Sequence, residues 1–229
     1  MNTETNAAPK PPVSAALGRA KSLGGGISII LFPIMLLLGF VTHPNILSFE
    51  MIANVDDWAA EWRGNFMFHF GHLLVMFAVP PIIVAAVRFM SLLTGAGAWY
   101  GFFGAILGVF GAFMLAVDKG ALTLVLSAFQ TIPDAQFDGI KPALQALLDR
   151  AGWLWITWGF IALPVGFVLL TIGLMKENII PTWQGVVIIA GLVFLINPDI
   201  EIISSAGALL MSIGFIPIGI REIRGTLAQ

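Results

Sequence analysis

The sequence contains no cysteine and very little charge. Of its 229 residues, only 10% are Asp, Glu, Lys or Arg, whereas 58% are hydrophobic. A typical soluble domain carries about 25% charged residues. The missing cysteines exclude disulfide bonds, thiolate metal sites and cysteine nucleophiles. Because a water-soluble fold of this length could not bury so much apolar surface, the composition indicates a polytopic membrane protein.

Other chemical signatures are also missing. The sequence has no phosphate-binding glycine loop, no nucleophile motif of the hydrolases and no basic stripe for nucleic acid. Histidine is scarce, with three in the whole chain. We therefore expect no nucleic-acid partner and favour a protein without catalytic activity.

Six apolar segments approach the roughly 20 residues that a membrane-spanning helix requires. They lie at residues 23–41, 66–87, 97–117, 152–175, 179–196 and 202–220. The sequence therefore predicts an all-α fold, a bundle of six transmembrane helices within residues 23–220, with the lipid bilayer around it. Residues 1–22 and 221–229 are expected to be cytoplasmic tails, the first of them flexible.

Lysine and arginine set the expected orientation. With the N-terminus in the cytoplasm and six alternating spans, most basic residues fall on the cytoplasmic side. These residues are Lys10, Arg19, Lys21, Arg88, Lys176, Arg221 and Arg224. The outer side receives Arg63, Lys119, Lys141 and Arg150. This bias follows the positive-inside rule, so we expect both termini in the cytoplasm and a location in a bacterial inner membrane.

The first long outer segment covers residues 42–65. It contains an amphipathic stretch that carries Trp58 and Trp62. Amphipathic helices with tryptophan on the apolar face bind at the headgroup region of a bilayer. This stretch is therefore expected to lie on the membrane surface.

The second long outer segment covers residues 118–151. Its pattern predicts two short helices separated at Pro133. A second interpretation extends the helix of the third span to Phe129, which would place Asp118 and Lys119 within the membrane.

Five glycines of the third span recur at spacings of four and three residues. They are Gly97, Gly101, Gly104, Gly108 and Gly111. This spacing puts all five on one stripe of the helix, where another helix can approach closely. The stripe could be the seam of a homo-oligomer or a packing surface inside the bundle, and we favour the second. Its continuation reaches Asp118, which is therefore expected to face the packed interior.

The second span contains two histidines in an otherwise apolar stretch. Asn65, His69 and His72 are separated by four and three residues, so they share one helix face near the outer end. Ionisable groups inside a span are costly and usually face the bundle interior or a water cavity. The candidate site at this depth consists of His69, His72, Asp118 and Glu201. Supporting residues at the same depth are His43, Asn65, Lys119, Asp199 and Ser205.

Several uses of this cluster are open. The histidines could tie helices together by hydrogen bonds, or they could bind a metal ion with the carboxylates. One histidine could ligate haem near the outer surface, or His and Asp could carry protons. We favour a non-catalytic membrane protein that binds a ligand or a metal ion, or that serves another membrane protein as an accessory subunit. The alternatives are a proton-coupled transporter of a small solute and a redox protein with haem or metal.

Three short segments carry a resemblance to other proteins. They are "GHLLVMF" in the second span, "AVDKGAL" at the outer end of the third and "IIPTWQGVVIIAGLVF" at the entry to the fifth. With these features in this order, residues 66–220 resemble small uncharacterised six-helix membrane proteins of bacteria. The resemblance implies a six-helix fold and brings no activity with it.

The charge bias predicts the topology in a form that reporter fusions can test. A reporter fused after Glu177 should lie in the cytoplasm, and one inserted beside Asp138 should lie outside. Alkaline phosphatase and a fluorescent protein, which are active on opposite sides of the membrane, measure both positions. The reverse pattern would overturn the placement of all six spans.

Overall fold

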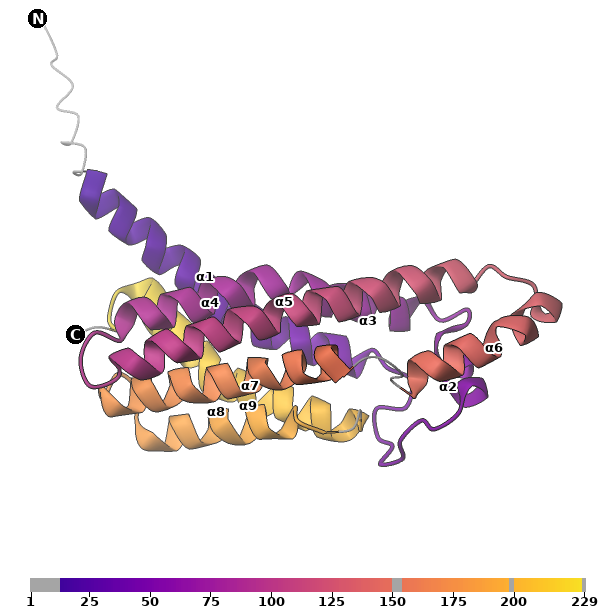
Figure 1. Ribbon diagram of the computed structural model, residues 1–229. Coiled ribbons are helices and arrows are strands. Elements are labelled where there is room, and N and C mark those ends of the chain that lie inside the picture. The colour runs from indigo at the N-terminus through magenta and orange to yellow at the C-terminus, as the bar shows by residue number, and fades with distance from the viewer. Residues whose placement is uncertain (1–12, 150–153, 198–199, 228–229) are drawn as a thin grey trace, which may run out of the picture.

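The computed structural model describes residues 13–149, 154–197 and 200–227 and shows one helical bundle (Figure 1). The described residues form helices and no strand. Two short helices, α2 (Val55–Trp62) and α6 (Asp134–Leu148), lie beyond one end of the bundle. We call this the cap end. The opposite end, where α1 begins and α9 finishes, is the terminal end.

The first helix, α1 (Val13–Val41), starts earlier than expected. Its last residue is the predicted one, and residues 13–22, which the sequence assigns to a flexible tail, belong to this helix. Alanine, leucine, arginine and lysine in this segment all favour a helix. The remainder of the predicted tail, residues 1–12, lies outside the described residues.

The second apolar segment folds as two consecutive helices. They are α3 (Phe66–Phe77) and α4 (Val79–Leu92), which meet at Ala78. Pro80 and Pro81 explain the break, because proline lacks the amide hydrogen of a helix interior and is tolerated only in the first turn. The pair ends at Leu92, beyond the predicted end at residue 87.

The third apolar segment lies in α5 (Ala98–Phe129), which does not stop near residue 117. The structure thus has the single helix of the second interpretation. With 32 residues and a rise of 1.5 Å each, α5 is about 48 Å long. A hydrocarbon core is about 30 Å thick, so α5 is longer than a helix needs to be to cross one. Figure 1 shows the last turns of α5 beside the cap, and α6 follows Pro133 as predicted.

The remaining helices are α7 (Leu154–Lys176), α8 (Thr182–Phe194) and α9 (Glu201–Arg224). Within the described residues, four segments are long and apolar enough to cross a membrane. These are Ser14–Val41, Phe66–Leu92, Ala98–Phe129 and Glu201–Arg224. The shorter apolar helices Ile161–Lys176 and Thr182–Phe194 accompany them. Helices of this length and composition indicate a membrane protein.

The glycine stripe of α5 packs inside the same chain. A Cβ atom at Gly104 would lie 2.8 Å from the carbonyl oxygen of Gly166 on α7 and 2.9 Å from the amide nitrogen of Leu170. Gly111 lies against the backbone of Leu163 on the same helix. Because α7 covers the stripe, these glycines are not available as the seam of a homodimer.

Four phenylalanines fill the middle of the bundle. Phe32, Phe89, Phe167 and Phe215 come from α1, α4, α7 and α9, and each is at most 1% exposed. Their ring centroids lie 5.0–6.4 Å apart, the range of favourable aromatic pairs. This aromatic cluster leaves the centre of the bundle filled by side chains.

The cap has a hydrophobic core of its own. Trp58 and Trp62 of α2 pack with Phe137 and Leu144 of α6 and with Leu126 near the end of α5. Trp62 is fully buried and its ring meets Phe137 edge to face at 5.8 Å. The apolar face of α2 thus packs on protein, where the sequence predicts contact with the membrane surface.

The packing of the glycine stripe predicts that replacing glycine by alanine affects stability differently at two positions. Gly104→Ala should lower the free energy of unfolding by about 1–3 kcal/mol, because its methyl group meets backbone atoms that cannot move aside. Gly24→Ala on α1, where no atom lies within 4 Å of the new Cβ, should be neutral or stabilise by up to about 1 kcal/mol. Thermal unfolding of the purified protein in detergent compares the two. Equal effects would show that α5 and α7 are not in close contact.

Candidate functional site

The polar cluster at the cap end is built around His43 and Glu201. His43 follows the end of α1, and Glu201 is the first residue of α9, so the two helices bring residues distant in sequence together. The Nδ1 atom of His43 lies 2.5 Å from Oε1 of Glu201. The two side chains are only 13% and 15% exposed. A short, half-buried hydrogen bond between groups that can carry opposite charges is a strong one.

His43 also stacks on His72 of α3. The two ring centroids are 5.0 Å apart and the planes differ by 12°. Phe68 contacts both rings, with centroids at 4.9 Å from His43 and 4.4 Å from His72. The Nδ1 atom of His72 lies 3.1 Å from the carbonyl oxygen of Phe68. A carbonyl only accepts, so this nitrogen carries the hydrogen and His72 is oriented by its own helix.

His69 does not join this stack. Its Nε2 lies 3.1 Å from the carbonyl oxygen of Trp62, and its ring meets the edge of that indole. Asn65 is the N-cap of α3, where its side chain accepts hydrogen bonds from the amides of Met67 and Phe68. His69 and His72, which the sequence groups in one candidate site, thus contact different partners in the structure.

Asp118 is buried, as its place on the glycine stripe predicts, with 4% of its surface exposed. It pairs with Lys119, whose Nζ lies 3.3 Å from Oδ2 of Asp118. The charge of Lys119 also acts on His72. Ser205 has a buried hydroxyl without a hydrogen-bond partner in the described part of the chain. Asp199 lies outside the described residues.

A pocket of about 410 Å³ opens beside the His43–Glu201 pair. We call it the acidic pocket. It is lined by Pro44, Asn45, Ser48, Glu50, Met51, Ile52, Asp57, Ala60, Glu61 and Glu201. Four of these residues are acidic and none is basic, so the pocket favours a positively charged occupant.

Glu61 is the most buried acid of this pocket, and the sequence analysis did not include it among the candidates. It lies on α2 and is only 4% exposed. The Nδ2 atom of Asn45 donates a hydrogen bond of 2.5 Å to its Oε1, and no Lys or Arg forms an ion pair with it among the described residues. Burial raises the pKa of Glu61 above its ordinary value of 4.5, and the hydrogen bond from Asn45 opposes this only in part.

A signal for Glu61 was present in the sequence. It follows Trp58 by three residues and precedes Trp62, so all three share one face of an amphipathic helix. An acid on an apolar face is a candidate for a buried functional group. The local pattern does not reveal that the fold brings Glu61 beside Asn45 and near His43 and Glu201.

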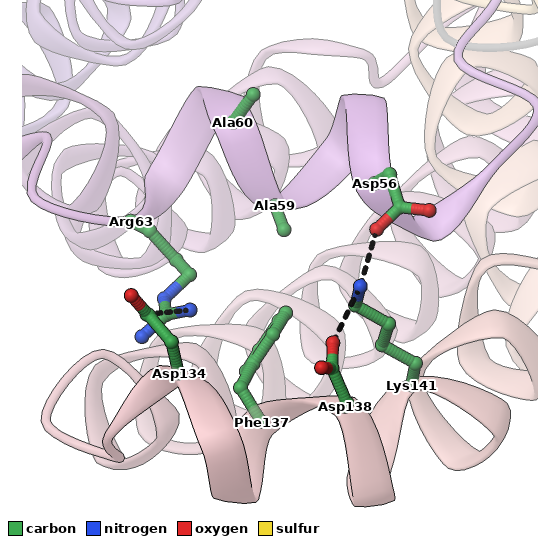
Figure 2. Close-up of a pocket in the computed structure, with 8 residues that line it drawn as sticks. All are labelled: Asp56, Ala59, Ala60, Arg63, Asp134, Phe137, Asp138 and Lys141. Carbon is green, nitrogen blue, oxygen red and sulfur yellow. Dashed lines mark ion pairs between the residues drawn. The ribbon is translucent and has the colours of Figure 1, made fainter.

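A second pocket, of about 320 Å³, separates α2 from α6 and is shown in Figure 2. At one side of it, Nη1 of Arg63 lies 3.0 Å from Oδ1 of Asp134. The Nη2 atom of the same side chain donates a hydrogen bond to the carbonyl oxygen of Ile132. The guanidinium lies 4.1 Å from the centroid of the Phe137 ring, a favourable cation–π distance. Its charge is therefore already neutralised.

At the other side of the second pocket, Lys141 bridges Asp56 and Asp138 with Nζ–Oδ1 distances of 2.8 and 2.7 Å (Figure 2). These two hydrogen bonds raise the pKa of the Lys141 ammonium. Gln145 of α6 also accepts a hydrogen bond from the amide of Val55, the first residue of α2. The charges of this pocket satisfy one another, so it serves as the junction that holds α2 on α6.

The arrangement does not fit the metal or haem centre considered above. Among the residues that the structure describes, no three His, Asp or Glu side chains are placed to hold one metal ion. Two histidines that ligate one haem point their nitrogens at the iron from opposite sides. His43 and His72 instead stack face to face at 5.0 Å, which leaves no room for a porphyrin between them.

Charges at the terminal end are paired as well. Arg88 of α4 forms an ion pair with Glu222 of α9, in which Nη2 and Nε of the arginine lie 2.6 and 2.8 Å from Oε1 of the carboxylate. Glu222 is only 2% exposed. Glu177 accepts hydrogen bonds from the amides of Gly95 and Gly97, which fixes the turn between α4 and α5. These contacts hold helix ends together and leave the acidic pocket as the candidate site.

Comparison of the chain with known protein families, with curated proteins and with solved structures gave no match. The resemblance to small six-helix proteins of bacteria therefore stays a prediction. The geometry of the acidic pocket is the observation that bears on function.

Burial of Glu61 predicts a pH dependence of stability. Because the fold raises the pKa of this carboxyl, its favourable contribution is complete below the ordinary value of 4.5 and is lost as the pH rises through the pKa in the folded state. Glu61→Gln keeps an acceptor for Asn45 without a charge, so the variant should lose less stability than the wild type over this rise. Thermal unfolding at a series of pH values measures the difference.

The matched control is Glu50→Gln, which changes an exposed acid at the rim of the same pocket. Its unfolding should follow the wild-type pH profile. If Glu61→Gln also follows that profile, the carboxyl of Glu61 is not buried in the folded protein.

Proposed function

We propose that this chain is a non-catalytic integral membrane protein that binds a small positively charged ligand in the acidic pocket. In this proposal the six apolar helical segments cross a bacterial inner membrane with both termini in the cytoplasm. The cap and the pocket then lie at the outer face. The bias of lysine and arginine supports this orientation. The length of α5, which exceeds a bilayer core, supports a cap outside the hydrocarbon region.

The observation that carries the proposal is the uncompensated carboxylate of Glu61. Transfer of a charged carboxylate out of water is costly unless a positive group accompanies it. Two other buried acids of the described chain have such a group, Arg88 for Glu222 and Lys119 for Asp118. Glu61 has the neutral amide of Asn45. A cationic ligand in the pocket would supply the missing charge.

The shape of the acidic pocket limits the ligand. Its volume of about 410 Å³ lies within the usual range of small-molecule sites, about 300–1,000 Å³. Met51, Ile52 and Pro44 add apolar surface beside the carboxylates. The expected ligand is therefore a small organic cation with an apolar part, such as an amine or a quaternary ammonium compound.

A proton-coupled transporter of the same ligand is the second candidate. The observation in its favour is the line of titratable groups that leads from Glu201 through His43 and His72 toward Lys119. The aromatic cluster lies farther along the bundle and fills its centre. Transport would require those four phenylalanines to separate, so a binding protein is the simpler function for this conformation.

Binding of organic cations to the purified protein tests the proposal. Choline, methylammonium and 1,4-diaminobutane serve as probes, and 3,3-dimethyl-1-butanol is the neutral match for choline. At least one cation should bind, and the neutral compound should bind at least about tenfold more weakly, a difference of about 1.4 kcal/mol. Isothermal titration calorimetry in detergent or nanodiscs measures both affinities.

Variants locate the site. Glu61→Gln and Glu201→Gln each remove one carboxylate of the acidic pocket and should weaken binding of the cation by about tenfold or more. Asp138→Asn, in the second pocket between α2 and α6, should leave the affinity within about twofold. Equal affinity of choline and its neutral match, or no binding by any of the three cations, would contradict the proposed function.

A further inference from the structure

We infer that the segment between α1 and α2, residues 42–54, is a membrane contact in which Leu47 and Phe49 reach into lipid at the headgroup boundary. We call this segment the α1–α2 loop. Its partner in this inference is the surface of the bilayer. The inference goes beyond the proposed function, because it does not require that the acidic pocket bind a cation.

The α1–α2 loop lies at the depth where two helices of membrane length end. The helix α1 finishes at Val41, and α9 begins at Glu201. With 24 residues, α9 is about 36 Å long, little more than the roughly 30 Å of a hydrocarbon core, so its first residue lies near the membrane boundary. His43 is bonded to Glu201, and Ser48 lines the acidic pocket together with Glu201 (Figure 1). These contacts hold the loop at the boundary.

Two large apolar side chains of the α1–α2 loop are turned away from the protein. Leu47 is 78% exposed and Phe49 is 71% exposed. The residues that alternate with them, Ser48 and Glu50, line the acidic pocket, whereas Leu47 and Phe49 are not part of its described lining. An extended chain points successive side chains to opposite sides. The loop therefore presents a polar side to the pocket and an apolar side to its surroundings.

The surroundings at this depth are apolar on the neighbouring helices too. Val41 is exposed at the end of α1, and Phe194 and Ile196 are exposed at the end of α8 and just after it, shortly before Glu201. Single exposed apolar residues are common on water-soluble surfaces. Here they continue the exposed apolar surface of membrane-length helices up to the loop, and lipid is the partner that covers such a surface.

The backbone limits how deeply the α1–α2 loop enters the bilayer. Residues 48–53 form neither helix nor strand. Irregular backbone exposed to lipid is not tolerated in the hydrocarbon core, because its amide and carbonyl groups lose their partners there. The chain therefore stays at the level of the headgroups, and the side chains of Leu47 and Phe49 extend below it. Because Ser48 and Glu50 lie on the same segment, this contact also fixes one wall of the acidic pocket, which opens at the membrane surface.

Spin labels measure what surrounds the α1–α2 loop. The sequence has no cysteine, so Leu47→Cys and Phe49→Cys each create a single labelling site in the full-length protein. The labelled proteins are placed in nanodiscs of phosphatidylcholine and phosphatidylglycerol. Relaxation of the label is enhanced by oxygen, which concentrates in lipid, and by a nickel chelate, which stays in water. We expect both labels to show a strong response to oxygen and a weak response to nickel.

Two other exposed positions calibrate this measurement. Phe110→Cys labels the middle of α5, and Ala135→Cys labels the start of α6, at the end of the cap farthest from the bundle (Figure 1). The loop labels should shift from the response at Ala135 toward the response at Phe110. A response equal to that at Ala135 would place the loop in water. A weak response to both reagents would show that a second copy or another protein covers the loop, and either result would overturn the inference.

A substitution beside the label tests whether the apolar side chains make the contact. In the labelled Phe49→Cys protein, Leu47→Ser should shift the response from lipid toward water. The matched control is Leu124→Ser, which removes an exposed leucine from α5 and should leave the response at Phe49 unchanged. No effect of Leu47→Ser, or the same effect of both substitutions, would contradict the role assigned to Leu47. No cation is added in these experiments, so failure of the proposed function and failure of this inference are seen separately.

Discussion

The close contact between α5 and α7 is the constraint on which the rest of the structure depends. Gly104 and Gly166 meet with so little space that a methyl group would touch backbone atoms. This contact fixes α5 along the bundle and directs its last turns beyond the bundle end (Figure 1). Those turns supply Leu126 to the core of the cap, and that core holds α2 in place. The position of Glu61, and with it the acidic pocket, thus follows from a seam of glycines some distance away.

The two pockets of the cap differ in whether their charged side chains form ion pairs within the pocket. In the pocket between α2 and α6, each charge has a partner of opposite sign, so the ion pairs hold two helices together. In the acidic pocket, carboxylates gather without a basic residue among its lining. Both pockets share α2, which lines the pocket toward α6 with Asp56 and Arg63 and the acidic pocket with Asp57 and Glu61. A helix held on one side by ion pairs can keep a costly carboxylate buried on its other side.

Much of the fold, but only part of the site, could be predicted from the sequence. Runs of apolar residues located the helices, and the glycine spacing placed Asp118 in the interior, because both are local patterns with a fixed period. The sequence also grouped His43, His72 and Glu201 at one depth, but it ranked His69 above His43. Their pairing depends on which helices are neighbours, and His43 and Glu201 are 158 positions apart. The surroundings of Glu61 depend likewise on the approach of Glu201 from α9, which no periodicity in residues 42–65 reveals.

The core of the cap also has a consequence for the order of assembly. Trp62 precedes α3, whereas Phe137 and Leu144 follow α5, so the segments that form this core are separated along the chain by the whole of α3, α4 and α5. During synthesis α2 emerges first, and the core around its tryptophans is incomplete until α6 has been made. Contacts between such distant segments form late, because the intervening chain must first be ordered. The cap is therefore completed only after the helices beneath it are in place, and the acidic pocket is among the last features of the molecule to mature.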